Sequence, residues 1–189
     1  MDEPTTADRY RTLAGDFTRR ARDVTPGGWD LPAPCDGWVA RDVVRHMVEW
    51  FPAFFLVSAG LSAPVGPDVD DDPVGAWLAV SGAVQAGLDD PVVSAREFDS
   101  PAGRYTLDRA VAMFGLADVL VHTWDLARAT GLDETLDPDE VHRFAVDMHA
   151  IPAAVDRAMR DSGHYGPRVT VPEDADDQTW LLGFMGRQP

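Results

Sequence analysis

The sequence has very little cysteine, relatively little positive charge and few long apolar runs. Cys35 is the only cysteine among 189 residues, which excludes an intramolecular disulfide and a multi-cysteine zinc cluster. A metal ion would therefore have to be held mainly by histidine and carboxylate side chains.

Acidic residues outnumber basic residues two to one. Lys and Arg together number 16 against 32 Asp and Glu, which gives a formal net charge of −16. Such a field repels the phosphates of nucleic acids and the surfaces of anionic membranes. We therefore expect neither nucleic acid nor a membrane as a partner.

Targeting signals are also missing from the pattern of the chain. Met1-Asp2-Glu3-Pro4 is not the basic start of a secretory signal, and no stretch approaches the roughly 20 apolar residues that a membrane helix needs. These features predict a cytoplasmic protein.

The composition that remains is that of a globular protein, with 45% hydrophobic and 25% charged residues. The length exceeds a typical compact domain but is short for two. We expect one domain over 1–189, with a bundle core at about 6–130 and a C-terminal helix and tail over 131–189.

Apolar residues recur at helical spacing in four long segments. This periodicity predicts helices over about 6–24, 39–59, 73–88 and 108–130. Thr5 with Asp8 three residues later is typical of a helix start, and Gly131 stands where a left-handed cap ends the last of the four. The expected fold is all-α, a four-helix up-and-down bundle with an additional C-terminal helix and a short tail.

The connecting segments are distinguished by proline, glycine and aspartate. Residues 25–37 are predicted to be a loop and 62–72 an acidic surface crossover, while 89–105 fits an irregular connection and a small hairpin equally well. After Gly131 the pattern predicts a fifth helix to about Asp161, an extended stretch over 168–171 and a short helix over 179–185.

Three side chains on core-facing stripes could hold a metal ion. Asp118 and His122 are four residues apart on one predicted helix and project side by side, while His46 lies on the inward stripe of another. Facing helices of a bundle commonly assemble metal sites in this way. Two imidazoles and one carboxylate suit zinc, nickel, iron or manganese, with positions left open for water or a substrate atom.

Simpler interpretations stay open for each residue. His46 could be a satisfied core histidine, and Asp118 with His122 could be an ion pair. Burial of Asp118, His122 and Asp125 on one stripe would be costly without a cation, which favours the metal site. We expect Asp125 to orient a ligand from outside rather than bind the ion, and Cys35 to be a buried inert thiol or a reactive thiol near the metal.

Three stretches carry a resemblance to a known family. They are the Trp-Asp-Leu-Pro-Ala-Pro-Cys-Asp-Gly-Trp run of 29–38 with the segment leading to His46, the run from Asp118 to Gly131, and the tail of 181–189. Together they resemble the DinB/YfiT-like superfamily. More narrowly, they are similar to the metal-binding domain of mycothiol-dependent maleylpyruvate isomerases, and most to its uncharacterised subgroup of metal-binding proteins.

The resemblance implies a four-helix bundle (DinB-like) and a ligand set of one histidine on the second helix plus an acid and a histidine four residues apart. Matched by position, these are His46, Asp118 and His122, the set that the spacing also indicates. The isomerases have Glu where this chain has Asp118, and they carry a further C-terminal domain for which this chain is too short. Maleylpyruvate isomerase activity itself is therefore not expected.

These observations predict a divalent-metal-binding protein, with zinc as the first choice of metal. The leading hypothesis is a metal-dependent enzyme that uses a small-molecule thiol, mycothiol by resemblance, to transfer or isomerise a small substrate. A metal-dependent hydrolase and a non-catalytic, metal-stabilised ligand-binding bundle are the alternatives. Whether the protein is an enzyme stays open, as does a homodimer, and no catalytic or cofactor-binding residue beyond the metal ligands is predicted.

Overall fold

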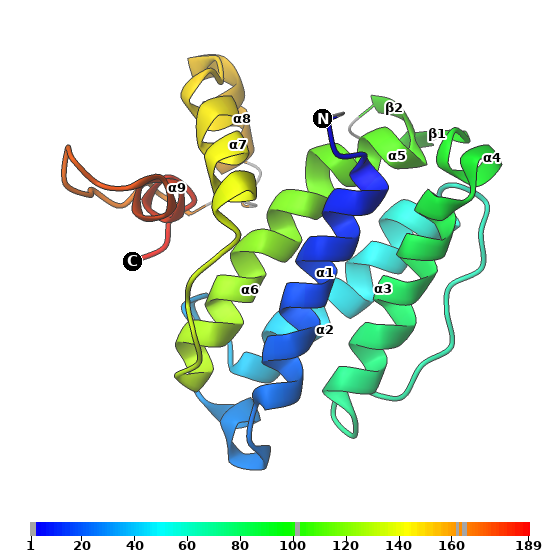
Figure 1. The fold of residues 1–189 in the computed structure, drawn as a ribbon, viewed down its shortest axis with the longest axis horizontal. Coiled ribbons are helices and arrows are strands. Elements are labelled where there is room, and N and C mark those ends of the chain that lie inside the picture. The colour runs from blue at the N-terminus through cyan, green and yellow to red at the C-terminus, as the bar shows by residue number, and fades with distance from the viewer. Residues whose placement is uncertain (1–2, 101–102, 162, 164–165) are drawn as a thin grey trace. The chain divides into compact units, whose positions relative to one another are not determined.

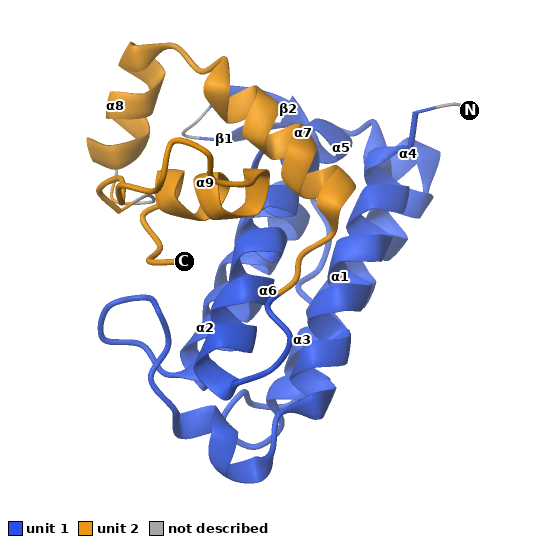
Figure 2. Ribbon diagram, turned by 60° about the vertical axis from the view of Figure 1, so that its left-hand side comes forward, with its two compact units in different colours: residues 1–134 blue, residues 135–189 orange. Residues whose placement is uncertain are grey.

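The structure is a computed structural model that describes residues 3–100, 103–161, 163 and 166–189. It divides into two compact units, residues 1–134 and residues 135–189, coloured blue and orange in Figure 2. The expectation of one domain over the whole chain stays a prediction.

The first unit begins with α1 (Thr6–Asp23), whose start is fixed as the sequence predicted. The Thr5 hydroxyl accepts a hydrogen bond from the Asp8 backbone N–H, and the Asp8 carboxylate accepts one from the Thr5 N–H. This reciprocal pairing satisfies amides that a helix start otherwise leaves without partners. Tyr10, Leu13 and Phe17 then recur on the buried face.

Helix α2 (Ala40–Phe51) continues without a break into a π-helical turn, Pro52–Val57. Proline has no backbone N–H, so Pro52 removes one α-helical hydrogen bond at the point where the wider turn begins. The loop predicted over 25–37 contains a short 3₁₀ turn, Pro26–Asp30, before α2 starts.

The third bundle helix, α3 (Pro73–Asp89), is capped by the Asp72 side chain, which accepts a hydrogen bond from the Gly75 N–H. The short helix α4 (Pro91–Ser94) follows, and then an antiparallel hairpin of β1 (Glu97–Ser100) and β2 (Gly103–Thr106). Of the two alternatives for 89–105, the structure therefore has the hairpin.

The fourth bundle helix runs from Leu107 to Thr130 in three parts: α5 (Leu107–Ala110), a π-helical turn (Val111–Gly115) and α6 (Leu116–Thr130). It ends at Gly131, whose φ of 70° is in the left-handed region and whose N–H donates to the Ala127 carbonyl. This is the predicted cap.

The four long helices pack as a bundle in which α1 and α2 each contact both α3 and α6 (Figure 1). Gln85 near the end of α3 donates to the carbonyl of Ala7 at the start of α1, so these two helices are antiparallel. The turn after α2 contacts both α3 and α5, so α2 ends where α3 ends and the fourth helix begins. The directions are thus down, up, up and down, because the long crossover after α2 carries the chain back along α3 (Figure 1). The all-α class and the helical bundle are confirmed, but the order is not simply up-and-down, because α2 and α3 run in the same direction.

Residues Leu107–Thr130 form one helix that is long and apolar enough to span a membrane by length and composition, with a mean hydropathy of 1.3 over a window of 18 of its residues. The sequence pattern had indicated no such stretch. In the fold 78% of this window is buried against the bundle, which is the environment of a core helix in a soluble protein.

The second unit contains α7 (Pro138–His149), α8 (Ala153–Asp161) and α9 (Asp177–Phe184), with α7 packed on α9. The expected single helix from 137 to about 161 is wrong, because it is interrupted at residues 150–152. Pro152 explains the break, since proline disfavours helical geometry in the residue before it. The final short helix is confirmed, while residues 168–171 lie outside any regular strand.

Candidate metal centre

The structure brings together the three side chains that the spacing selected. His46 projects from α2, and Asp118 and His122 project from adjacent turns of α6, which packs against α2. The imidazole rings of His46 and His122 have centroids 4.9 Å apart. Possible ligand atoms of all three side chains lie within 4.8 Å of one another.

The two carboxylate oxygens of Asp118 each face a different imidazole. Nε2 of His46 lies 3.4 Å from Oδ2, and Nε2 of His122 lies 3.4 Å from Oδ1. These distances are longer than a typical N–H···O hydrogen bond of about 2.7–3.2 Å. They match the separation of two ligand atoms on one tetrahedral ion, which is about 3.3 Å when the metal–ligand bonds are about 2.0–2.1 Å. The donor set therefore fits one divalent ion.

The centre is buried on one side and open on the other. The side chain of His122 is only 7% exposed, whereas those of His46 and Asp118 are 33% and 23% exposed. A small molecule can therefore approach from the side of His46 and Asp118, while His122 is held within the bundle.

Asp118 and His122 shift each other's protonation. Burial by itself would raise the pKa of Asp118, but the charge of His122 and the closeness of both imidazoles hold that pKa well below its usual range. Burial would likewise lower the pKa of His122, but Asp118 raises it well above its usual value, with hydrogen bonds to Asp125 and Cys35 adding to the effect. A divalent ion at this position would compensate the carboxylate charge of Asp118, as the proton on His122 does without it.

The second ring nitrogen of His122 is occupied by Asp125. Nδ1 of His122 lies 2.8 Å from Oδ2 of Asp125, whose residue is completely buried. This distance is typical of a hydrogen bond and is shorter than the separation of two ligand atoms on one ion. With a proton on Nδ1, Nε2 is left as the lone-pair donor toward Asp118 and His46.

Cys35 lies next to Asp125. Its Sγ lies 3.5 Å from Oδ2 of Asp125, and Cys35, His122 and Asp125 form a second group whose possible ligand atoms lie within 4.8 Å of one another. Because Nδ1 of His122 is already at hydrogen-bond distance from Asp125, the first group is the better candidate for a metal site. Cys35 is only half-buried.

Two tryptophans, Trp50 and Trp38, adjoin the candidate centre. The Trp50 indole N–H donates to Oδ2 of Asp118 at 3.1 Å. The Trp38 ring stacks on His122 with a centroid separation of 5.9 Å and contacts His46 at 5.3 Å. The spacing of four residues between His46 and Trp50 was the signal that could have placed Trp50 here.

The described histidines of the second unit have other partners. Nδ1 of His142 lies 2.7 Å from Oδ2 of Asp177, and the ring of His149 stacks on Trp180 at 3.6 Å. These contacts within residues 135–189 account for both side chains.

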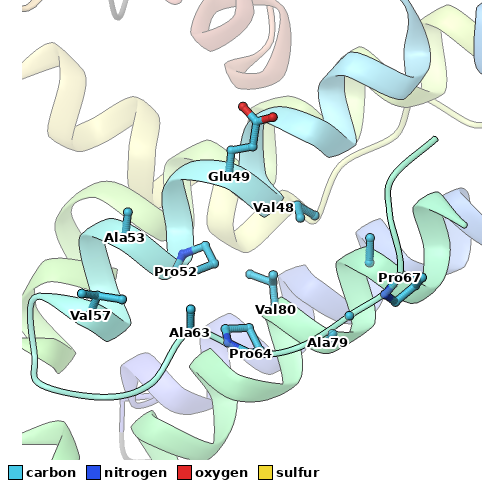
Figure 3. A pocket seen from close by; sticks show the side chains of 12 residues that line it. Val48, Glu49, Pro52, Ala53, Val57, Ala63, Pro64, Pro67, Ala79 and Val80 are labelled. Atoms are coloured by element: carbon cyan, nitrogen blue, oxygen red, sulfur yellow. The ribbon is translucent and has the colours of Figure 1, made fainter. Parts of the chain in front are cut away.

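A separate hollow of about 380 Å³ lies between α2 with its π-helical turn, the crossover and α3 (Figure 3). Its walls are mainly apolar side chains such as Val48, Pro52, Pro64 and Val80, and Glu49 is the titratable residue in its lining. None of the three candidate metal ligands is among its lining residues.

The family model for the mycothiol maleylpyruvate isomerase N-terminal domain matches residues 10–127, which include all three candidate ligands. Two proteins of Mycobacterium tuberculosis, from strains CDC 1551 / Oshkosh and H37Rv and both named as uncharacterized, are each 29% identical over 161 residues. The match covers 82% of this chain and 83% of each relative. No solved structure matches the chain.

Proposed function

The chain belongs to the mycothiol maleylpyruvate isomerase N-terminal domain family, and on that premise we propose that it is a metal-dependent enzyme using a low-molecular-weight thiol. His46, Asp118 and His122 are the proposed ligands of one divalent ion, with zinc as the first candidate. Mycothiol is the proposed thiol, and a small electrophilic molecule is the substrate. We place the protein in the cytoplasm, where thiols are kept reduced.

The observation that carries this proposal is the placement of one carboxylate between two imidazoles. Both N–O separations are 3.4 Å, as expected of neighbouring ligands on one ion. Three protein ligands leave a divalent ion with room for an exchangeable ligand, unlike a closed structural site with four. Because His46 and Asp118 are partly exposed, the open coordination position would be accessible to a small molecule.

When bound, the ion would supply positive charge that favours the thiolate form of an entering thiol. The protein's own residues fix the arrangement. Asp125 holds the ring of His122, Trp50 holds the carboxylate of Asp118, and Trp38 stacks against the His122 ring. A thiolate could displace a leaving group from an electrophilic carbon, which transfers the thiol. It could instead add to a conjugated double bond, whose electron pair moves to the conjugated carbonyl oxygen; rotation about the resulting single bond and departure of the thiolate, with return of the electron pair, then isomerise the substrate.

Metal content is the first test. Purified protein should bind close to one divalent ion per chain, and His122→Ala should lose most of it, because water replaces a lost imidazole ligand poorly. His142→Ala is the matched control, since His142 also pairs with an aspartate but in the second unit. Equal metal content in His122→Ala and the wild type would refute the assigned site.

Cobalt substitution tests the use of a thiol. Mycothiol added to the cobalt-loaded protein should produce an intense near-ultraviolet sulfur-to-cobalt charge-transfer band, which water cannot produce, and His46→Ala should abolish it. Normal cobalt uptake without a spectral change for any cellular thiol would rule out thiol chemistry. The hydrolase or the metal-stabilised bundle would then replace it.

A further inference from the structure

The side of the candidate metal centre toward the hairpin is lined by aromatic rings. On α2 and its π-helical turn, His46, Trp50 and Phe54 follow one another at intervals of four residues. On the fourth helix the interval is the same for His122, Asp118 and Phe114. Residues four apart share a helix face, so metal ligands and aromatic rings form one strip on each helix.

The rings make a continuous path away from the ligands. Trp50 contacts His46 at a centroid distance of 6.0 Å and Phe54 at 5.5 Å. Phe54 contacts Phe114 across the two helices at 5.4 Å, and Phe114 contacts Tyr105 of β2 at 5.4 Å. We name Trp50, Phe54, Phe114 and Tyr105 the aromatic strip.

Both helices have a π-helical turn where the strip crosses between them. Phe54 lies in Pro52–Val57, and Phe114 lies in Val111–Gly115. Gly115 lets the backbone of the fourth helix approach the Phe55 ring closely, since a Cβ at this position would lie 3.2 Å from that ring. Such turns are often found at functional sites because they alter the direction in which side chains project.

The strip is not ordinary core. Its four residues are each half-buried, whereas neighbouring Phe51 and Phe55 are completely buried. These four residues are therefore partly accessible to solvent, and Trp50 adjoins the candidate ligand His46. The ring side chains carry no charge, and the net charge of −16 works against anionic ligands.

We propose that the aromatic strip binds the apolar, planar part of a small substrate, aromatic or conjugated, whose reacting atom reaches the metal centre. Phe54 and Phe114 then determine specificity, because their contact lies one helical turn beyond Trp50 and Asp118. Edge-to-face ring contacts, such as the 85° angle between Phe54 and Phe114, leave ring surfaces suited to another flat group. This inference rests on the proposed metal centre.

A pair of metal-binding probes tests the strip without requiring catalysis. Benzohydroxamate and acetohydroxamate share a chelating head and differ in a phenyl ring against a methyl group. Their dissociation constants are measured on the full-length cobalt-loaded protein from its visible absorption. The phenyl compound should bind about tenfold more tightly, the effect of burying roughly 60 Å² of ring surface.

The variants locate the origin of that preference. Phe54→Ala and Phe114→Ala should bring the two affinities to within about twofold of each other while leaving acetohydroxamate binding nearly unchanged. Phe54→Leu keeps more of the packing and should lower the preference partially. Val57→Ala, at an exposed position on the same turn, should retain the wild-type preference.

The outcomes separate this inference from the proposed function. If both probes bind the wild type equally, or the preference survives in Phe54→Ala and Phe114→Ala, the strip is not a binding surface although the metal centre stands. A protein that takes up cobalt and binds neither probe has no accessible position on the ion, which would overturn both proposals.

Discussion

Trp50 on α2 donates its indole N–H to Oδ2 of Asp118 on α6, the same oxygen that faces Nε2 of His46. The oxygen therefore has one fixed donor and one imidazole neighbour. Because Trp50 and His46 share a helix face, the bond ties the carboxylate of one helix to the ligand-bearing face of the other. This contact restricts rotation of Asp118 before any ion is bound.

Trp50→Phe tests that restriction. Phenylalanine keeps an aromatic ring at this position but cannot donate a hydrogen bond, so the carboxylate becomes freer to turn away. We expect metal affinity to fall about tenfold, in the range seen when a partner of a metal ligand is lost. Competition with a chromophoric chelator measures it. Trp180→Phe in the second unit should have no effect, and unchanged affinity in Trp50→Phe would show that the indole bond is dispensable.

Asp125→Asn tests the orientation of His122. The buried carboxylate holds Nδ1 at 2.8 Å, and an amide would accept the same hydrogen bond without its charge or would turn its NH₂ group toward the ring. Metal affinity should fall about 10- to 100-fold while the helical circular dichroism is retained.

The chain provides a matched control for this variant. Asp177 approaches Nδ1 of His142 with the same type of oxygen at 2.7 Å, but on the surface of the second unit. Asp177→Asn should therefore leave metal affinity unchanged. An equal loss of affinity in both variants would point to general destabilisation instead of an effect on the metal ligand.

Metal uptake should depend on pH through His122. In the metal-free protein, burial opposes the charged imidazole, yet Asp118 raises the pKa of His122 well above 6.5. Below that raised pKa an entering ion must displace a proton, so apparent affinity should fall by about tenfold for each pH unit of acidification. Above it the dependence on this group should disappear. Affinities measured across this range that do not vary with pH would contradict the shift.

The bundle was largely predictable because helical periodicity and caps are local signals. Thr5 with Asp8 and the glycine at 131 fixed two helix ends correctly. The direction of α3 depends on how the crossover runs in space, which periodicity does not encode. The break before α8 could have been anticipated from Pro152, because proline restricts the preceding residue.

The candidate centre was also predictable only in part. The pair Asp118 and His122 follows from four-residue spacing on one helix, and His46 follows from its inward stripe. The four-residue spacing from His46 could have placed Trp50 beside the centre, but its hydrogen bond to Asp118 depends on how α2 packs against α6, which spacing does not encode. The proximity of Cys35 to Asp125, 90 residues apart in the chain, depends on how the loop before α2 folds back.

Tyr10 on α1 is completely buried, and among the residues that the structure describes its hydroxyl has no hydrogen-bond partner. Burial also raises the pKa of this phenol, so the group stays neutral. A buried polar group without a partner costs about 1–3 kcal/mol.

Tyr10→Phe removes that hydroxyl and should raise the free energy of unfolding by about 1 kcal/mol, as measured by urea denaturation. Thr18→Val is the opposite case on the same helix. The Thr18 hydroxyl accepts a 2.9 Å hydrogen bond from the Trp77 indole, so its removal leaves a buried donor without a partner and should lower stability by about 1–3 kcal/mol. If Tyr10→Phe is instead destabilised to a similar extent, the Tyr10 hydroxyl must bond to a buried water molecule, because removal of a group without a partner cannot have that cost.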